Sequence, residues 1–168
     1  METYERQKQT EEPPLGVAGL GGWLVLVQIS LYLSIITRVG TLLQSLPLIA
    51  GPDTGHPLTS PGSPLYHPLW KTSFMIEGIT SAGMLIFTIF ILVSFYQKKR
   101  ILPRMMIMFY ILNFLLLVTI VLLVNQIPLA KEVEGVSGIS TIIGGLAGCA
   151  IWIPYFLKSE RVRNTFRN

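Results

Sequence analysis

Two ionisable residues, Arg38 and Glu77, lie within segments of this 168-residue chain that are otherwise apolar enough to cross a lipid bilayer. A charged group in hydrocarbon is costly, so such a residue is a candidate functional site that needs a partner. Arg38 follows Trp23 by fifteen residues, and Glu77 follows Trp70 by seven. If these tryptophans mark the two membrane surfaces, rises of about 22 and 10 Å place both charges at a similar depth. The spacing therefore predicts a direct or water-bridged Arg38–Glu77 ion pair. The side chains expected to support this pair are Ser34, Thr37 and Ser81.

Each charge also has a separate explanation, because Arg38 can extend alone towards the headgroups while Glu77 stays protonated. In each segment, polar residues share one helix face with the charged residue. They are Ser30 and Ser34 in one segment, and Thr80, Ser81 and Thr88 in the other. Such stripes either join helices by hydrogen bonds or line a path for protons or a small solute. In the second case Glu77 is the titrating site of a transporter.

The remaining chemistry-bearing residues predict no catalytic, cofactor or metal site. His56 and His67 share a proline-rich connection without nearby cysteines or carboxylate clusters, so a metal site is not expected. Cys149 is alone in an apolar stretch, which excludes a disulfide framework. No serine–histidine–carboxylate set or glycine-rich phosphate loop is present. The basic residues lie beside apolar stretches and not along one helix face, which argues against nucleic-acid binding.

The composition and the lengths of the apolar stretches predict an all-α integral membrane protein. Half of the residues are hydrophobic (51%) and few are charged (13%), and only helices satisfy such a backbone inside lipid. A transmembrane helix needs about 20 residues. The expected bundle of four transmembrane helices occupies 20–46, 72–96, 105–124 and 138–157, with Pro47 ending the first, within a membrane domain 18–157.

The distribution of lysine and arginine predicts the orientation. The connections expected on one side are 47–71 and 125–137, and those on the other are 97–104, the N-terminal tail 1–17 and the C-terminal tail 158–168. Ten basic residues fall on the second side, against Lys71 and Lys131 on the first. Because basic residues mark the cytoplasmic face, both termini are expected in the cytoplasm.

Small residues in the last span indicate close helix packing. Ser140, Gly144 and Gly148 recur at every fourth position, and such spacing lets another helix backbone approach closely. An adjacent stripe consists of Thr141, Gly145 and Cys149. We expect the first stripe to pack within the bundle, with a second copy or another protein as the alternative partner in a homo- or hetero-oligomer.

Several segments together resemble a known family. They are GLGGWL (19–24), Arg38, LYHPLW…FMIE (65–77), FYQKKR…PR (95–104) and IWIPYFLKSERVRNTF (151–166). They are similar to the bacterial inner-membrane family catalogued as domain of unknown function 2569. The resemblance implies a four-span protein of the bacterial inner membrane without an assigned biochemical activity. Its matching positions are Gly21, Gly22, Trp23, Arg38, Glu77, Trp152, Pro154, Tyr155, Phe156, Lys158, Arg161, Asn164 and Phe166.

The C-terminal segment is the most specific of these, and its residue types suit a membrane surface. Pro154 favours a kink or stop near the helix end, and Trp152 and Tyr155 belong in the headgroup layer. The basic residues expected on anionic lipid at the cytoplasmic face are Lys158, Arg161 and Arg163. A cytoplasmic partner that binds the RVRNTF tail is the alternative. The leading functional expectation is thus a non-enzymatic helix-packing component or small subunit, and the alternative is a small-solute or proton-linked transporter.

Overall fold

The computed structural model describes residues 18–50 and 57–167, with the backbone alone at 49–50 and 129–137. This part of the chain contains helices and no strand. The helices are α2 (Trp23–Ala50), α3 (Pro68–Tyr96), α4 (Leu102–Val124), α5 (Pro128–Lys158) and α6 (Glu160–Thr165). The first four are long and apolar enough to cross a membrane, which confirms the predicted all-α class with four transmembrane helices. The tail 1–17 and His56 lie outside the described residues.

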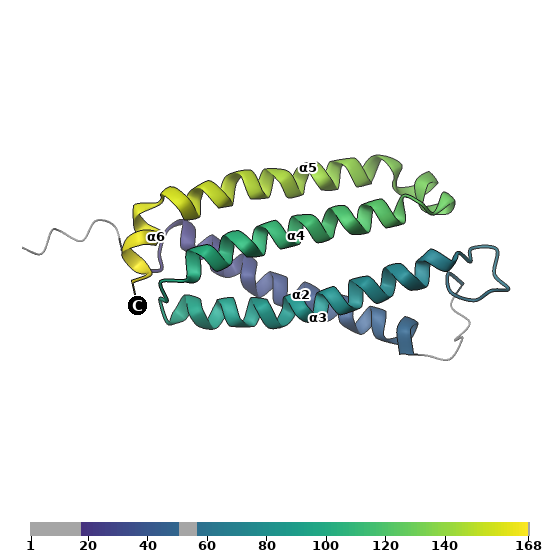
Figure 1. Cartoon of the computed structure of the whole chain (residues 1–168), viewed down its shortest axis with the longest axis horizontal. Coiled ribbons are helices and arrows are strands. Elements are labelled where there is room, and N and C mark those ends of the chain that lie inside the picture. The colour runs from purple at the N-terminus through teal and green to yellow at the C-terminus, as the bar shows by residue number, and fades with distance from the viewer. Residues whose placement is uncertain (1–17, 51–56, 168) are drawn as a thin grey trace, which may run out of the picture.

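The long helices form two packed pairs. α2 packs on α3, α4 packs on α5, and α3 joins the pairs by packing on α4. Figure 1 shows both ends of the described chain, α6 and the turn between α3 and α4 at one end of the molecule. We call this the terminal end. The connections 57–67 and 125–127 lie at the opposite end.

Large apolar side chains cover the outside of the long helices, as a lipid environment requires. Ile36, Ile79 and Ile86 are each about two thirds exposed or more, at 67%, 69% and 70%. The buried core lies towards the terminal end, where α2, α3, α4, α5 and α6 all contribute. Its members include Leu24, Val27, Ile91, Phe95, Leu102, Met106, Phe156, Val162 and Phe166.

The helices extend beyond the predicted spans at their proline-containing ends. α2 continues through Pro47 to Ala50. A proline near a helix end removes one backbone hydrogen bond, whereas the residues that continue the helix form further ones. Pro68 and Pro128 each occupy the first helical position, where a missing N–H is harmless. The predicted connection 125–137 is therefore mostly helical, since Pro128 starts α5 and the strong helix formers Leu-Ala-Lys-Glu follow.

Candidate functional site

A cavity with both polar and apolar walls lies between the four long helices, inside the region predicted to lie in the membrane. Its volume is about 460 Å³. The polar side chains that line it are Ser30, Ser34 and Arg38 from α2, Glu77 and Thr80 from α3, Tyr110 and Asn113 from α4, and Cys149 from α5. Apolar side chains of α4, including Phe114 and Leu117, complete the wall. The two ionisable residues singled out in the sequence thus border the same cavity.

The direct partner of Arg38 is Asn113, not Glu77. Arg38 Nη2 donates a hydrogen bond to Asn113 Oδ1, and Asn113 Nδ2 donates to the carbonyl oxygen of Phe109 one turn earlier at 2.8 Å. The Glu77 carboxylate interacts electrostatically with Arg38. Among the described residues, however, the ion pair within contact distance is Arg163–Glu160.

The direct form of the predicted Arg38–Glu77 pair is therefore replaced by a hydrogen bond across the cavity to α4, and the water-bridged form stays a prediction. The physical reason is the arrangement of the helices, because α4 also borders the cavity and lies beside Arg38. The amide of Asn113 satisfies part of the guanidinium as a neutral acceptor. Sequence reasoning missed this residue, although an asparagine within the apolar run ILNFLLLV was itself a signal.

Of the three residues expected to support the pair, Ser34 alone lines the cavity. Thr37 donates to the backbone carbonyls of Leu33 and Ser34 on its own helix, at 3.0 Å each. Ser81 is 1% exposed, and its hydroxyl has no hydrogen-bond partner in the described part of the chain. The Thr37 hydroxyl thus bonds to its own helix, and neither Thr37 nor Ser81 has a hydrogen bond to Arg38 among the described residues.

The polar stripe on α3 divides into two parts with different surroundings. Glu77 and Thr80 line the cavity. Further along the helix, Thr88 is completely buried and donates to the carbonyl of Met84 at 2.7 Å. The stripe thus lines the cavity near the start of α3, and it packs closely against neighbouring helices nearer the terminal end.

Gly145, which belongs to the adjacent stripe on α5, packs closely against α4. A Cβ at Gly145 would lie 2.6 Å from Leu117 Cδ2 and 3.2 Å from Phe114 Cδ2 on α4. Cys149 Sγ lies 3.5 Å from the carbonyl oxygen of Tyr110, also on α4. In contrast, nothing lies within 4 Å of a Cβ at Gly144 or Gly148, and Ser140 is exposed. The predicted close packing of the Ser140–Gly144–Gly148 face within the bundle is therefore not seen at Gly144 or Gly148, although Gly148 borders the cavity.

The glycine-rich segment before α2 contacts the C-terminal segment at the terminal end. Thr165 Oγ1 accepts a hydrogen bond from the backbone N–H of Gly19 at 2.9 Å. Gly22 has a φ of +63°, in the left-handed region, which favours glycine. The guanidinium of Arg161 lies over Gly21 and Gly22, 3.2–3.5 Å from where their Cβ atoms would be. A side chain on either glycine would displace Arg161.

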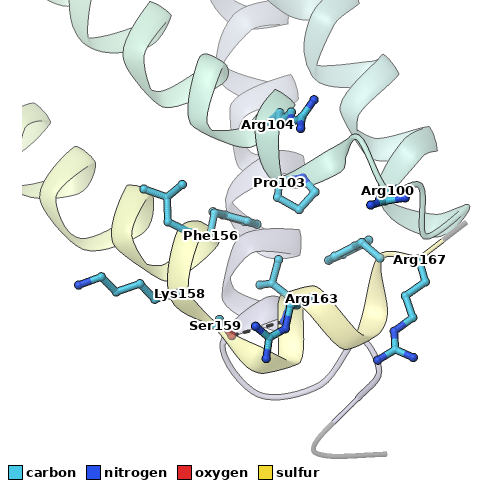
Figure 2. Close-up of a pocket in the computed structure, with 11 residues that line it drawn as sticks. Arg100, Pro103, Arg104, Phe156, Lys158, Ser159, Arg163 and Arg167 are labelled. Atoms are coloured by element: carbon cyan, nitrogen blue, oxygen red, sulfur yellow. Dashed lines mark hydrogen bonds between the residues drawn. The ribbon is translucent and has the colours of Figure 1, made fainter.

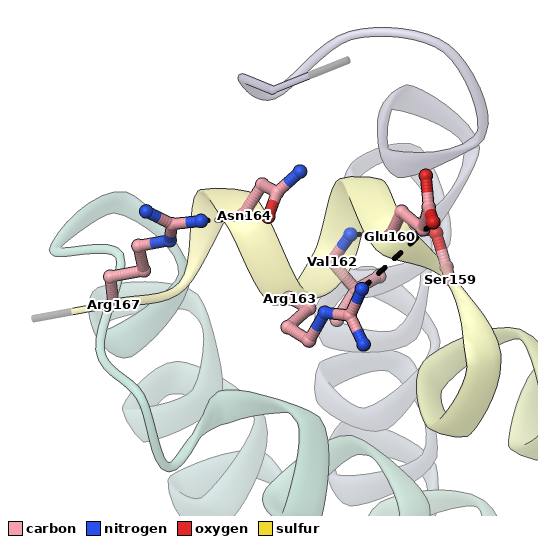
Figure 3. Close-up of polar contacts among 6 residues, drawn as sticks. All are labelled: Ser159, Glu160, Val162, Arg163, Asn164 and Arg167. Atoms are coloured by element: carbon pink, nitrogen blue, oxygen red, sulfur yellow. Dashed lines mark hydrogen bonds and ion pairs between the residues drawn. The ribbon is translucent and has the colours of Figure 1, made fainter. Parts of the chain in front are cut away.

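The tail after α5 is folded against the bundle. Ser159 Oγ accepts a hydrogen bond from Val162 N at 3.4 Å, and Arg167 donates one to Asn164 at 2.8 Å. An exposed ion pair joins Arg163 and Glu160 at 3.9 Å. These contacts lie in and beside α6 (Figure 3). The side chains of Val162 and Phe166 are 1% and 3% exposed and belong to the core. The predicted surface tail 158–168 thus contains two apolar residues that anchor it to the core, Val162 within α6 and Phe166 directly after it.

The aromatic residues of the C-terminal box form one cluster beside the start of α2. The ring centroids of Trp23 and Trp152 are 6.1 Å apart, and those of Trp152 and Tyr155 are 5.9 Å apart. α5 continues through Pro154 to Lys158, so this proline does not stop the helix. Lys158 and Arg163 are exposed beside the cluster, whereas Arg161 is partly buried.

His67 has a structural role in the described part of the chain. Its Nδ1 accepts a hydrogen bond from the backbone N–H of Leu69 at 3.3 Å and so caps the start of α3. No group of three or more metal-ligating residues occurs within residues 18–50 and 57–167.

Comparison with known proteins agrees with this architecture. A family model described as "Protein of unknown function (DUF2569)" matches residues 17–167. A curated relative, the inner membrane protein YdgK of Escherichia coli strain K12, is 25% identical over 154 residues, which cover 89% of this chain and 94% of the relative. No solved structure matches the chain. The family match includes the glycine-rich segment, the residues around the Arg38 cavity and the C-terminal box.

Proposed function

The chain belongs to the DUF2569 family of proteins of unknown function, and from that premise we propose that it is a non-enzymatic component of the bacterial cytoplasmic membrane that associates with another membrane helix. It is a multi-pass membrane protein with four membrane-spanning helices. Its relative in Escherichia coli is named an inner membrane protein, and the cytoplasmic membrane is the corresponding location here.

The charge distribution supports an orientation with the terminal end in the cytoplasm. Lys98, Lys99, Arg100 and Arg104 lie between α3 and the first turn of α4, and further basic residues follow α5 at the same end. On the opposite end the basic side chain within the described residues is Lys71. Positive charge of this kind is retained on the cytoplasmic side during insertion.

The observation that carries the proposed association is the position of Arg38 in a cavity that reaches the outer surface of α2. Arg38, Ser34 and Asn113 also line an adjoining depression of about 330 Å³, together with the exposed Leu33 and Thr37. A guanidinium has five N–H donors, and Arg38 makes one hydrogen bond within the described part of the chain. In hydrocarbon the other donors need acceptors. A second membrane helix with a polar side chain over the depression would supply them.

Site-specific photo-crosslinking in native membranes tests this association. A photoreactive residue at Leu33, which is 58% exposed and borders the depression, is compared with one at Ile79, which is 69% exposed but does not border it. We expect a discrete protein adduct from position 33 that is missing from position 79. Arg38→Leu in the Leu33 background should abolish that adduct. Lipid adducts alone at both positions would refute the proposal.

A transporter is the second candidate, because Glu77 and Arg38 border one cavity of about 460 Å³. Such a role requires water or solute in the cavity. Single cysteines at Ser34 and Thr80, which line the cavity, can be compared with a cysteine at Thr88, which is fully buried outside it. All three are made in a Cys149→Ser background.

Labelling with a membrane-impermeant thiol reagent then separates the two candidates. Modification at positions 34 and 80 without modification at 88 would favour a water-filled transport path through the cavity. Protection of all three would favour association with a helix that excludes water.

A further inference from the structure

A second cavity, of about 660 Å³, lies at the terminal end and has a strongly basic rim. Five basic side chains line it: Arg100, Arg104, Lys158, Arg163 and Arg167. Within residues 18–50 and 57–167, no acidic residue belongs to the lining. Figure 2 shows Pro103 and Phe156 in the middle of the view, with the labelled basic side chains placed around them.

The five charges come from separate parts of the chain, and the fold brings them together. Arg100 and Arg104 flank the start of α4, Lys158 ends α5, and Arg163 and Arg167 lie in and after α6. Burial of Val162 and Phe166 holds α6 in place. Apolar anchoring thus keeps like charges around one cavity, although like charges repel each other.

These charges are not neutralised within the described residues. The Glu160–Arg163 ion pair is 3.9 Å long, and its side chains are 78% and 77% exposed. An exposed pair of this kind contributes little. In the part of the chain that the structure describes, it leaves four of the five rim charges without an acidic partner in contact. The cavity therefore suits an anion.

The depth of the cavity identifies which anion is available. Phe156 and Leu157 in its lining belong to the last turn of the membrane-crossing stretch Gly138–Lys158. Leu157 is 67% exposed, as expected for a side chain in contact with acyl chains. Trp23 and Trp152 pack together one turn deeper, and tryptophan marks the headgroup boundary. The cavity thus spans the boundary at which a lipid phosphate lies above its acyl chains.

We propose that this cavity binds the phosphate-bearing headgroup of an anionic glycerophospholipid, with the basic rim on the phosphate and the apolar lining beside the start of the acyl chains. Its volume lies within the range of small-molecule sites, about 300–1,000 Å³. The side chains are long and exposed, so they can converge on the phosphate when it is bound. The site is separate from the cavity around Arg38 and does not depend on the proposed helix association.

Native mass spectrometry of the full-length protein from neutral detergent tests the site, because the mass identifies the bound molecule. The protein is titrated with phosphatidylglycerol, phosphatidylcholine and, separately, inorganic phosphate. The test variant is Arg163→Gln/Arg167→Gln, which leaves the basic residues between α3 and α4 unchanged. The matched control is Lys98→Gln/Lys99→Gln, which removes the same charge from the same end but outside the cavity lining.

We expect the wild type to bind one phosphatidylglycerol in preference to phosphatidylcholine. The double arginine variant should bind it about 30-fold more weakly, on the order of fivefold for each charge removed. The lysine variant should stay within about twofold of the wild type, because its charges are outside the cavity. Circular dichroism checks that both variants are folded, as expected for exposed side chains.

Three results would overturn the proposal. Equal losses in the two variants would mean that surface charge in general, and not this cavity, attracts the lipid. Equal binding of phosphatidylcholine would remove the role of the basic rim. Binding of inorganic phosphate in place of lipid would show a site for a soluble anion.

Discussion

Valine at Gly145 on α5 should separate α5 from α4, whereas valine at the neighbouring Gly144 should not. A Cβ at Gly145 would already lie 2.6 Å from Leu117 Cδ2 and 3.2 Å from Phe114 Cδ2. Non-bonded carbon atoms prefer about 3.5–4.0 Å. At Gly144 nothing lies within 4 Å of a Cβ. The two substitutions make the same chemical change one residue apart on one helix, so their intrinsic helix propensities change equally.

The expected difference follows from the contact distances. Leu117 Cδ2 is the end of a flexible side chain and can rotate away from a single methyl group. The two further methyl groups of valine then meet the ring of Phe114, and overpacking of this kind destabilises by about 1–3 kcal/mol. For a chain of this length, a loss of about 2 kcal/mol lowers the melting temperature by roughly 4–8 °C. Gly144→Val should change stability by less than about 0.5 kcal/mol.

The single cysteine of the chain provides the assay. Cys149 Sγ lies 3.5 Å from the Tyr110 carbonyl on α4, so a thiol-reactive fluorescent dye reports the separation of α5 from α4 on heating. The monomeric fraction of each variant is purified in the same detergent and heated with the dye. Coinciding melting curves for the Gly145 and Gly144 variants would refute packing through Gly145. A larger loss in Gly144→Val would place the Ser140–Gly144–Gly148 face in the packed interface instead.

Three further predictions concern the cavity and the terminal end. Thr165→Val keeps the shape of the side chain but removes the acceptor for Gly19 N–H, so thermal denaturation should reveal a loss of about 1 kcal/mol; an unchanged midpoint would contradict the contact. Phe166→Ala should destabilise by about 3–5 kcal/mol in the same measurement, because the ring is 3% exposed in the core, and a loss typical of a surface residue would mean that α6 is not docked. Asn113→Leu should lower stability by about 1–3 kcal/mol, because Arg38 loses its acceptor, and the double variant with Arg38→Leu should recover part of this loss; additive losses would exclude the interaction.

The number of spans could be predicted from the sequence because length and apolarity suffice for that inference. The four apolar stretches exceed the length needed to cross a bilayer, and the structure has four corresponding helices. Helix ends were less predictable. The sequence predicts that Pro47 ends a helix and that Pro154 kinks or ends one, yet both lie inside helices. A proline near a helix end removes few hydrogen bonds, and a longer helix pairs more backbone groups.

The partner of Arg38 could not be derived from depth alone. Depth along the membrane normal placed Arg38 and Glu77 near each other, and both do border one cavity. Which neighbour Arg38 reaches depends on the lateral order and rotation of the helices, and one sequence does not specify these. Asn113 on α4 occupies the decisive position. The burial of Val162 and Phe166 was readable in principle from their four-residue spacing within a basic segment, but their basic neighbours favoured a surface interpretation.

The contact between Gly19 and Thr165 has a consequence for how the protein is made. These residues are separated by 146 positions in the sequence, so the contact cannot form until all four spans have been synthesised. Chains fold from the N-terminus as they emerge during synthesis. The glycine-rich segment and the Leu24 side chain are therefore made before the C-terminal residues that pack near them. Closure of the terminal end is thus a late event of assembly in the membrane. A chain that stops before Val162 would contain every transmembrane helix and still expose the core of its terminal end, which is a feature that cellular quality control can recognise.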